Sequence, residues 1–236
     1  MNSNKWTIIA CSNKNNKYLH LKYLRQSNEH NQIIKLNMLE NQVTDSHWEC
    51  DKVIRNWFLS KPDRINNIKY NNIALVEYDV LITQPLPNIK LNNELLCHKK
   101  MTTERHSEWQ NWQWLFKVNE LTAYFGYSVG CMPFSLYFMS KNCLSIWLDK
   151  KHDDIYNHPM SGEVRLPTIL NRNGVQINKH PSLKQVKFLH RYNLNFDINV
   201  PGIYHPVKYS THNIAKIKQH FYKIPESDKN NKDSSN

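Results

Sequence analysis

Two carboxylates stand close together near the end of an apolar stretch at residues 72–82, where Glu77 is followed by Asp79. The stretch predicts a buried strand closed by Pro85, and side chains two residues apart on an extended chain point the same way. Two buried anions repel each other and lose hydration, so they require a metal, basic residues or water. Because carboxylate oxygens suit Mg²⁺ and Mn²⁺, the pair predicts a hard-cation site. Ordinary ion pairs at a strand end are the alternative.

A second group of polar residues comes late in the chain, in the run Gly-Ile-Tyr-His-Pro-Val-Lys at 202–208. Gly202 permits a tight backbone path there, and the neighbouring prolines stiffen it. A neutral His205 would add a nitrogen ligand, which suits Mn²⁺ better than Mg²⁺, and Lys208 would bind a phosphate as a point charge. The chain contains 12 histidines. The assignment of His205 therefore depends on its meeting the two acids in the fold.

Glu163 begins a predicted helix at residues 162–170. The helix dipole favours a carboxylate at this end, so a capping role is one interpretation. A general base is the other interpretation, provided that this helix start faces the metal site.

The order of elements predicts one α/β domain over residues 1–224. Strands are expected at 6–11, 32–36 and 72–82, and helices from about Ser46, around 135–147 and at 162–170. Alternating strands and helices favour a mostly parallel central sheet flanked by helices. Residues 225–236 are almost entirely polar and are predicted to form a disordered tail.

The composition limits the class of protein. No apolar run approaches the roughly 20 residues that span a bilayer, and we expect a cytoplasmic protein with its five cysteines reduced. A net charge of +11 indicates an anionic partner, or simply a basic surface. The sequence contains no Gly-x-Gly-x-x-Gly or Walker pattern. A dinucleotide enzyme and a P-loop ATPase are therefore not supported.

Taken in order, these residues resemble a GT-A-type glycosyltransferase. Val76-Glu77-Tyr78-Asp79-Val80 is similar to the family's Asp-x-Asp motif, with Glu77 in place of the first Asp. His205 fits the family's late histidine ligand. Glu163 is similar to the base of inverting members, although Val164 stands where a second acid is usual.

The resemblance implies transfer of a sugar from a nucleotide-sugar donor to a hydroxyl of a carbohydrate or glycolipid acceptor, with inversion preferred. Mn²⁺ or Mg²⁺ would be the cofactor, and cell-surface polysaccharide or lipopolysaccharide synthesis the context, with peripheral contact at the inner membrane face. The expected metal ligands are Asp79, Glu77 and His205; the expected donor-binding residues are Asp51, Arg55 and Lys208; and the expected acceptor-binding residues are Trp112 and Trp114.

Alternatives remain for both the aromatic residues and the function. The tryptophans of the 108–116 stretch are favoured as core packing, with a stacking platform as the second interpretation. A basic protein without catalysis that binds nucleic acid or anionic membrane, or another metal-dependent enzyme acting on phosphate esters, would also account for the charge and the acids. Nucleic acid is not an expected partner of the transferase.

Overall fold

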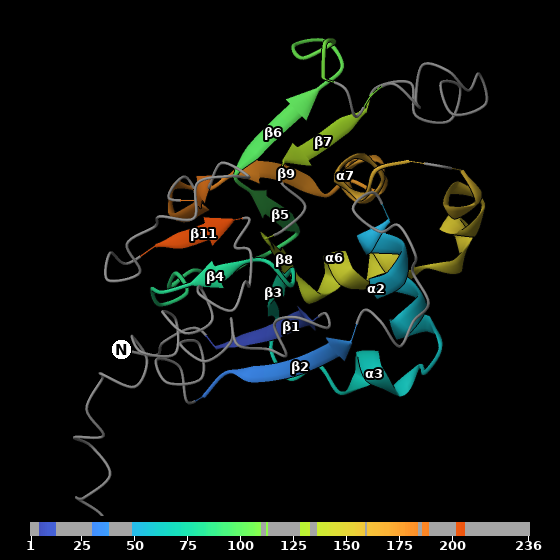
Figure 1. The fold of residues 1–236 in the computed structure, drawn as a ribbon. Coiled ribbons are helices and arrows are strands. Elements are labelled where there is room, and N and C mark those ends of the chain that lie inside the picture. The colour runs from blue at the N-terminus through green and yellow to red at the C-terminus, as the bar shows by residue number, and fades with distance from the viewer. Residues whose placement is uncertain are drawn as a thin grey trace, which may run out of the picture.

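A six-stranded mixed sheet lies at the centre of the chain (Figure 1). The computed structural model describes residues 5–12, 30–37, 49–109, 112, 128–132, 136–158, 160–183, 186–188 and 202–205. In spatial order the strands are β2 (Gln32–Asn37), β1 (Trp6–Ser12), β3 (Asn72–Val76), β8 (Leu136–Ser140), β5 (Glu94–Cys97) and β9 (Gln176–Lys179).

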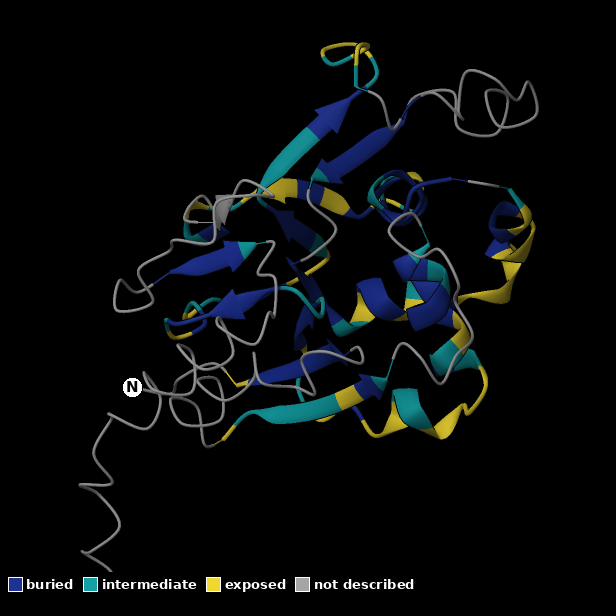
Figure 2. Cartoon of the chain, in the orientation of Figure 1, coloured by how far each residue is buried: buried dark blue, intermediate teal, exposed yellow. Residues whose placement is uncertain are grey.

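Only β8 runs against the other strands of this sheet. β1 is parallel to both β2 and β3, and β9 is parallel to β5, whereas β8 pairs antiparallel with β3 on one side and β5 on the other. The prediction of an α/β chain with a mostly parallel sheet is confirmed. The central strands β1 and β3 are buried along their whole length, as expected for strands covered on both faces (Figure 2).

Three helices cover one face of the sheet: α2 (Cys50–Leu59), α6 (Lys141–Leu148) and α7 (Gly162–Arg172). Their apolar sides pack in one core with every second strand residue, including Ile9, Ile73 and Leu75. The alternation of side chains along a strand sends the intervening residues, such as Ile8 and Ala74, to the opposite face and a second core.

The second core is closed by a small three-stranded sheet of order β10-β11-β4. Its strands are β4 (Leu81–Ile82), β10 (Val186–Phe188) and β11 (Ile203–His205). The antiparallel pair β6 (Lys99–Thr102) and β7 (Val129–Met132) extends beyond the main sheet (Figure 1). The remaining elements are α3 (Asp63–Asn66) and the short 3₁₀ helices η4 (Lys150–Asn157) and η5 (Pro181–Leu183).

Two predicted elements differ in the structure. The strand expected over 72–82 is divided, because β3 ends at Val76 and the chain turns before β4 begins. The helix expected around 135–147 begins instead with strand β8, and the helix proper starts at Lys141. Ser140 explains the change of element, since its hydroxyl caps α6 by accepting a hydrogen bond from the Cys143 amide at 3.3 Å.

Some predictions lie outside the described residues. They include the polar tail at 225–236 and the helix start near Ser46; in the described part, α2 begins at Cys50. All five cysteines are buried and none forms a disulfide. No helix in the described ranges has the length and apolar character needed to cross a membrane.

Candidate metal centre

The turn that follows β3 places Glu77 and Asp79 at the carboxyl edge of a central strand. The Val80 amide donates a hydrogen bond to the Glu77 carbonyl over 3.3 Å, which closes the turn. Both carboxylates therefore belong to a turn rather than to an extended strand, and the physical reason given above for their convergence was wrong. Their position at this edge agrees with the usual place of ligands in open α/β sheets.

The pairing of β4 with β11 brings His205 to the same turn. Ile203 lies opposite Ile82 and Tyr204 opposite Leu81, so the next residue of β11 lies beside the start of β4. The Thr83 amide donates to the Gly202 carbonyl over 2.8 Å, which fixes this register. As a result, His205 Nε2 lies 3.4 Å from Asp79 Oδ1.

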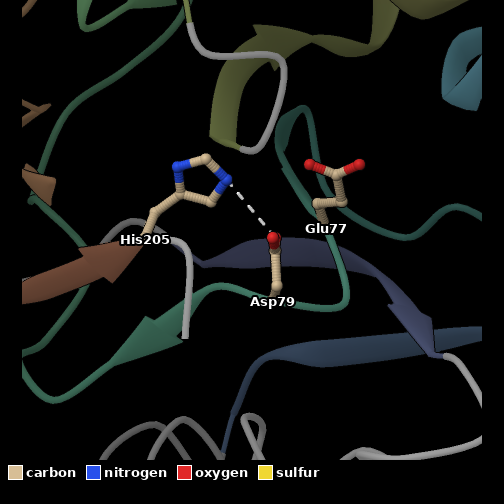
Figure 3. A group of neighbouring side chains, drawn as sticks. All are labelled: Glu77, Asp79 and His205. Carbon is tan, nitrogen blue, oxygen red and sulfur yellow. Dashed lines mark ion pairs between the residues drawn. The ribbon is translucent and has the colours of Figure 1, made fainter. Parts of the chain in front are cut away.

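Glu77, Asp79 and His205 form a cluster whose ligand atoms all lie within 4.8 Å of one another (Figure 3). The Asp79 and His205 side chains are only 19% and 15% exposed. Asp79 Oδ1 is shielded from solvent and receives no hydrogen bond of normal geometry from the described residues. Two carboxylates and an imidazole with such an atom between them fit a divalent cation, and Mn²⁺ accepts this mixture of oxygen and nitrogen.

The charges of the cluster act strongly on one another. Burial raises the pKa of Glu77 from 4.5 to about 7, and the Asp79 carboxylate contributes to this rise. Burial alone would lower the pKa of His205, but the nearby carboxylates of Asp79, Glu77 and Glu163 outweigh it and raise that pKa. The carboxylates thus favour positive charge at this place, whether as bound protons or as a bound cation.

Glu163 lies at the start of α7, within electrostatic reach of the cluster. Its amide donates to the hydroxyl of the N-cap residue Ser161 over 3.2 Å, and its side chain is half-buried. The negative charge of Glu163 contributes to the raised pKa of both Glu77 and His205. The charge of Glu163 thus acts on the cluster, and its role as a general base stays a prediction.

Cys50 also contacts the cluster, and the sequence did not point to it. This first residue of α2 donates its thiol hydrogen to Glu77 Oε1 over 2.9 Å. A single cysteine far from the acids in sequence carries no signal of such a contact.

Asp51 and Arg55, predicted to bind the donor, have protein partners. Asp51 is fully buried and accepts two hydrogen bonds from the Arg165 guanidinium, at 2.8 and 3.0 Å. Arg55 donates to the carbonyls of Trp147 and Asp149 and pairs with Asp153 at 2.6 Å. Both residues thus connect α2 to neighbouring segments, and their role in donor binding stays a prediction.

The aromatic candidates are described only in part. Trp112 is 1% exposed, its ring packs edge-on against Trp109, and its indole N–H donates to the His106 carbonyl over 2.8 Å. This placement favours the core-packing interpretation over a stacking platform. Trp114 and Lys208 lie outside the described residues.

Comparison with known proteins finds likeness only among solved structures. No protein-family model matches the sequence, and no curated protein does. A glycosyltransferase involved in glycosylation of the major capsid of PBCV-1 matches with 12% identity and a TM-score of 0.47, covering 93% of this chain and 99% of that one. The glycosyltransferase GlyE of Streptococcus pneumoniae TIGR4 matches with 10% identity and a TM-score of 0.44, covering 87% of this chain.

A third structure, an active-site mutant of LgtC, matches with 9% identity and a TM-score of 0.43, covering 94% of this chain and 98% of that one. The chain spans about half of GlyE, 55% of its length. Identities and TM-scores this low do not establish a common family. What the site does must therefore be argued from its own residues.

Proposed function

We propose that the chain is a metal-dependent glycosyltransferase that moves a sugar from a nucleotide-sugar donor to a hydroxyl acceptor. The observation that carries the proposal is the convergence of Glu77, Asp79 and His205 from distant parts of the sequence. Their place at the carboxyl edge of β3 suits a ligand site, and their order matches the family resemblance of the sequence.

The cluster would hold Mn²⁺ or Mg²⁺ through the carboxylates of Glu77 and Asp79 and the imidazole of His205. The cation supplies positive charge that neutralises the diphosphate leaving group of the donor. Asp79 is the central ligand in this proposal, since Oδ1 lies near His205 and receives no regular hydrogen bond from the described residues. In this proposal, the positively charged side chain of Lys208 would bind the same diphosphate.

Glu163 would serve as the general base of an inverting reaction. As the acceptor oxygen bonds to the anomeric carbon, its proton passes to a carboxylate oxygen of Glu163, and the bond between that carbon and the diphosphate oxygen breaks. The half-buried position of Glu163 at a helix start, and the effect of its charge on the pKa of His205, support this role.

We further propose a carbohydrate or glycolipid acceptor in cell-surface polysaccharide or lipopolysaccharide synthesis. A net charge of +11 suits peripheral contact with an anionic membrane surface. A cytoplasmic location at the inner membrane face belongs to the same proposal.

The proposal is tested first by ligand binding. Nucleoside diphosphates and nucleotide sugars with different bases are screened for a rise in melting temperature, with and without Mn²⁺. A ligand of the native state raises apparent stability by about 2.7 kcal/mol at a hundred times its Kd. We expect one base to give a shift that requires the metal.

Variants and products complete the test. Asp79→Ala should lose the metal-dependent shift, whereas Asp63→Ala, which changes an exposed acid of α3 outside the cluster, should retain it. Undiminished metal-dependent transfer by Asp79→Ala would refute the assigned site. Release of phosphate from esters without any sugar transfer would favour the phosphate-ester enzyme instead.

A further inference from the structure

The thiol of Cys50 is buried against a carboxylate of the candidate metal centre. Cys50 is 2% exposed, and its sulfur lies 2.9 Å from Glu77 Oε1. The contact joins the first turn of α2 to the turn after β3, two segments that are 27 positions apart in sequence. Cys50, which is not one of the three candidate metal ligands, thus directly contacts the candidate ligand Glu77.

The chemistry of the two groups decides which one donates. A carboxylate that binds a cation is ionised and only accepts hydrogen bonds, whereas a thiol is a weak donor. A thiol ordinarily loses its hydrogen only above about pH 8.5, so the sulfur keeps it at neutral pH. Cys50 therefore donates the hydrogen bond, and Glu77 Oε1 accepts it.

The position of this donor is fixed by the core. α2 is held against the sheet by Val53, Ile54 and Phe58, each at most 2% exposed. Glu77, in contrast, is a long side chain on a turn, and its side-chain torsions must be restrained before its carboxylate can meet a cation. The rigid thiol supplies that restraint, and the partial positive charge of the helix start favours the anion.

We propose that Cys50 is a positioning residue of the metal centre, which holds the Glu77 carboxylate by one oxygen so that the carboxylate is presented to a divalent cation. This inference depends on the metal site of the proposed function, but not on the transfer of a sugar. It predicts that the thiol hydrogen contributes to cation affinity in the absence of any nucleotide.

The test measures Mn²⁺ binding to the full chain by titration calorimetry, without donor or acceptor. Cys50→Ala removes the donor and should weaken Mn²⁺ binding by about threefold to tenfold. Removing a hydrogen-bond partner of a metal ligand typically lowers metal affinity by about tenfold to a hundredfold, and the effect here should be smaller because a thiol is a weak donor. Cys50→Ser keeps an O–H donor and should bind within about twofold of the wild type. The matched control is Cys143→Ala, which removes another fully buried thiol that donates to the Glu94 carbonyl, outside the cluster.

A double-mutant cycle separates positioning from a general loss of packing. In a Glu77→Ala background, Cys50→Ala should have no further effect on Mn²⁺ affinity, because the carboxylate that it positions is absent. An equal loss in both backgrounds, an unchanged Cys50→Ala, or a Cys50→Ser as weak as Cys50→Ala would each overturn the role. Absence of Mn²⁺ binding by the wild type would overturn the metal centre itself, and the role of Cys50 with it.

Discussion

The buried ion pair between Asp51 and Arg165 gives the sharpest prediction about stability. Both side chains are 0% exposed, and two hydrogen bonds of 2.8 and 3.0 Å join them. Asp51→Asn would leave the guanidinium charged and uncompensated in the core, a change that typically costs about 3–5 kcal/mol. Arg165 would keep its hydrogen bonds to the carbonyls of Met160 and His158, so we expect a loss of stability near the lower end of this range.

A loss of about 3 kcal/mol lowers the melting temperature of a chain of this size by roughly 6–12 °C. Thermal unfolding followed by circular dichroism measures the shift. Lys151→Ala is the control, because it breaks an ion pair with Asp149 in which both side chains are exposed, and it should cost at most about 1 kcal/mol. Asp51→Asn with a melting temperature equal to that of Lys151→Ala would refute the reasoning. Weakened nucleotide binding at unchanged stability would support the predicted donor role of Asp51.

Three further predictions concern the site and the helix start. Because the pKa of Glu77 is raised from 4.5 to about 7, its contribution to the stability of the metal-free protein is complete below pH 4.5 and is lost as the pH rises through 7. Melting temperatures measured across this range should therefore fall with rising pH, and Glu77→Gln should make the fall smaller. The rise in melting temperature caused by Mn²⁺ should grow over the same range, because the cation binds the ionised carboxylate. Glu163→Gln should lower the turnover number by about 10²–10⁴-fold in a transfer assay while calorimetry shows unchanged Mn²⁺ binding, and full activity would exclude its role as base. Gly162→Ala should lower the melting temperature by an amount equivalent to about 1–3 kcal/mol, because the new Cβ would lie 2.8 Å from Asp51 Oδ1, and an unchanged value would show that this contact can relax.

The sequence predicted the part of the site that local patterns determine. The apolar run before Glu77 identified a central strand and the edge of the sheet where acids could bind a ligand. The turn was not visible in that run, because Val80, Leu81 and Ile82 continue the apolar pattern and carry no Gly or Pro to mark a reversal.

Long-range pairing set the limit of sequence reasoning. Asp51 and Arg55 have the charges of ligand-binding residues, and nothing local reveals that their partners lie on other segments. The antiparallel β8 was hidden for a similar reason, since a short apolar run beside a helix suits either element. Only the tertiary fold shows which side chains each of these residues contacts.

The short pairing of β4 with β11 has a consequence for how the cation and the fold depend on each other. Two opposed residue pairs hold β11 in register with β4, and His205 is the last residue of that strand. His205 can bind the cation only in molecules in which β11 is paired with β4. The apparent affinity for the cation therefore falls as the fraction of molecules with a displaced β11 rises. By the same linkage, the bound cation should stabilise the contact between β11 and the turn that follows β3. Amide hydrogen exchange at Ile203 and Tyr204 should then slow when Mn²⁺ is added.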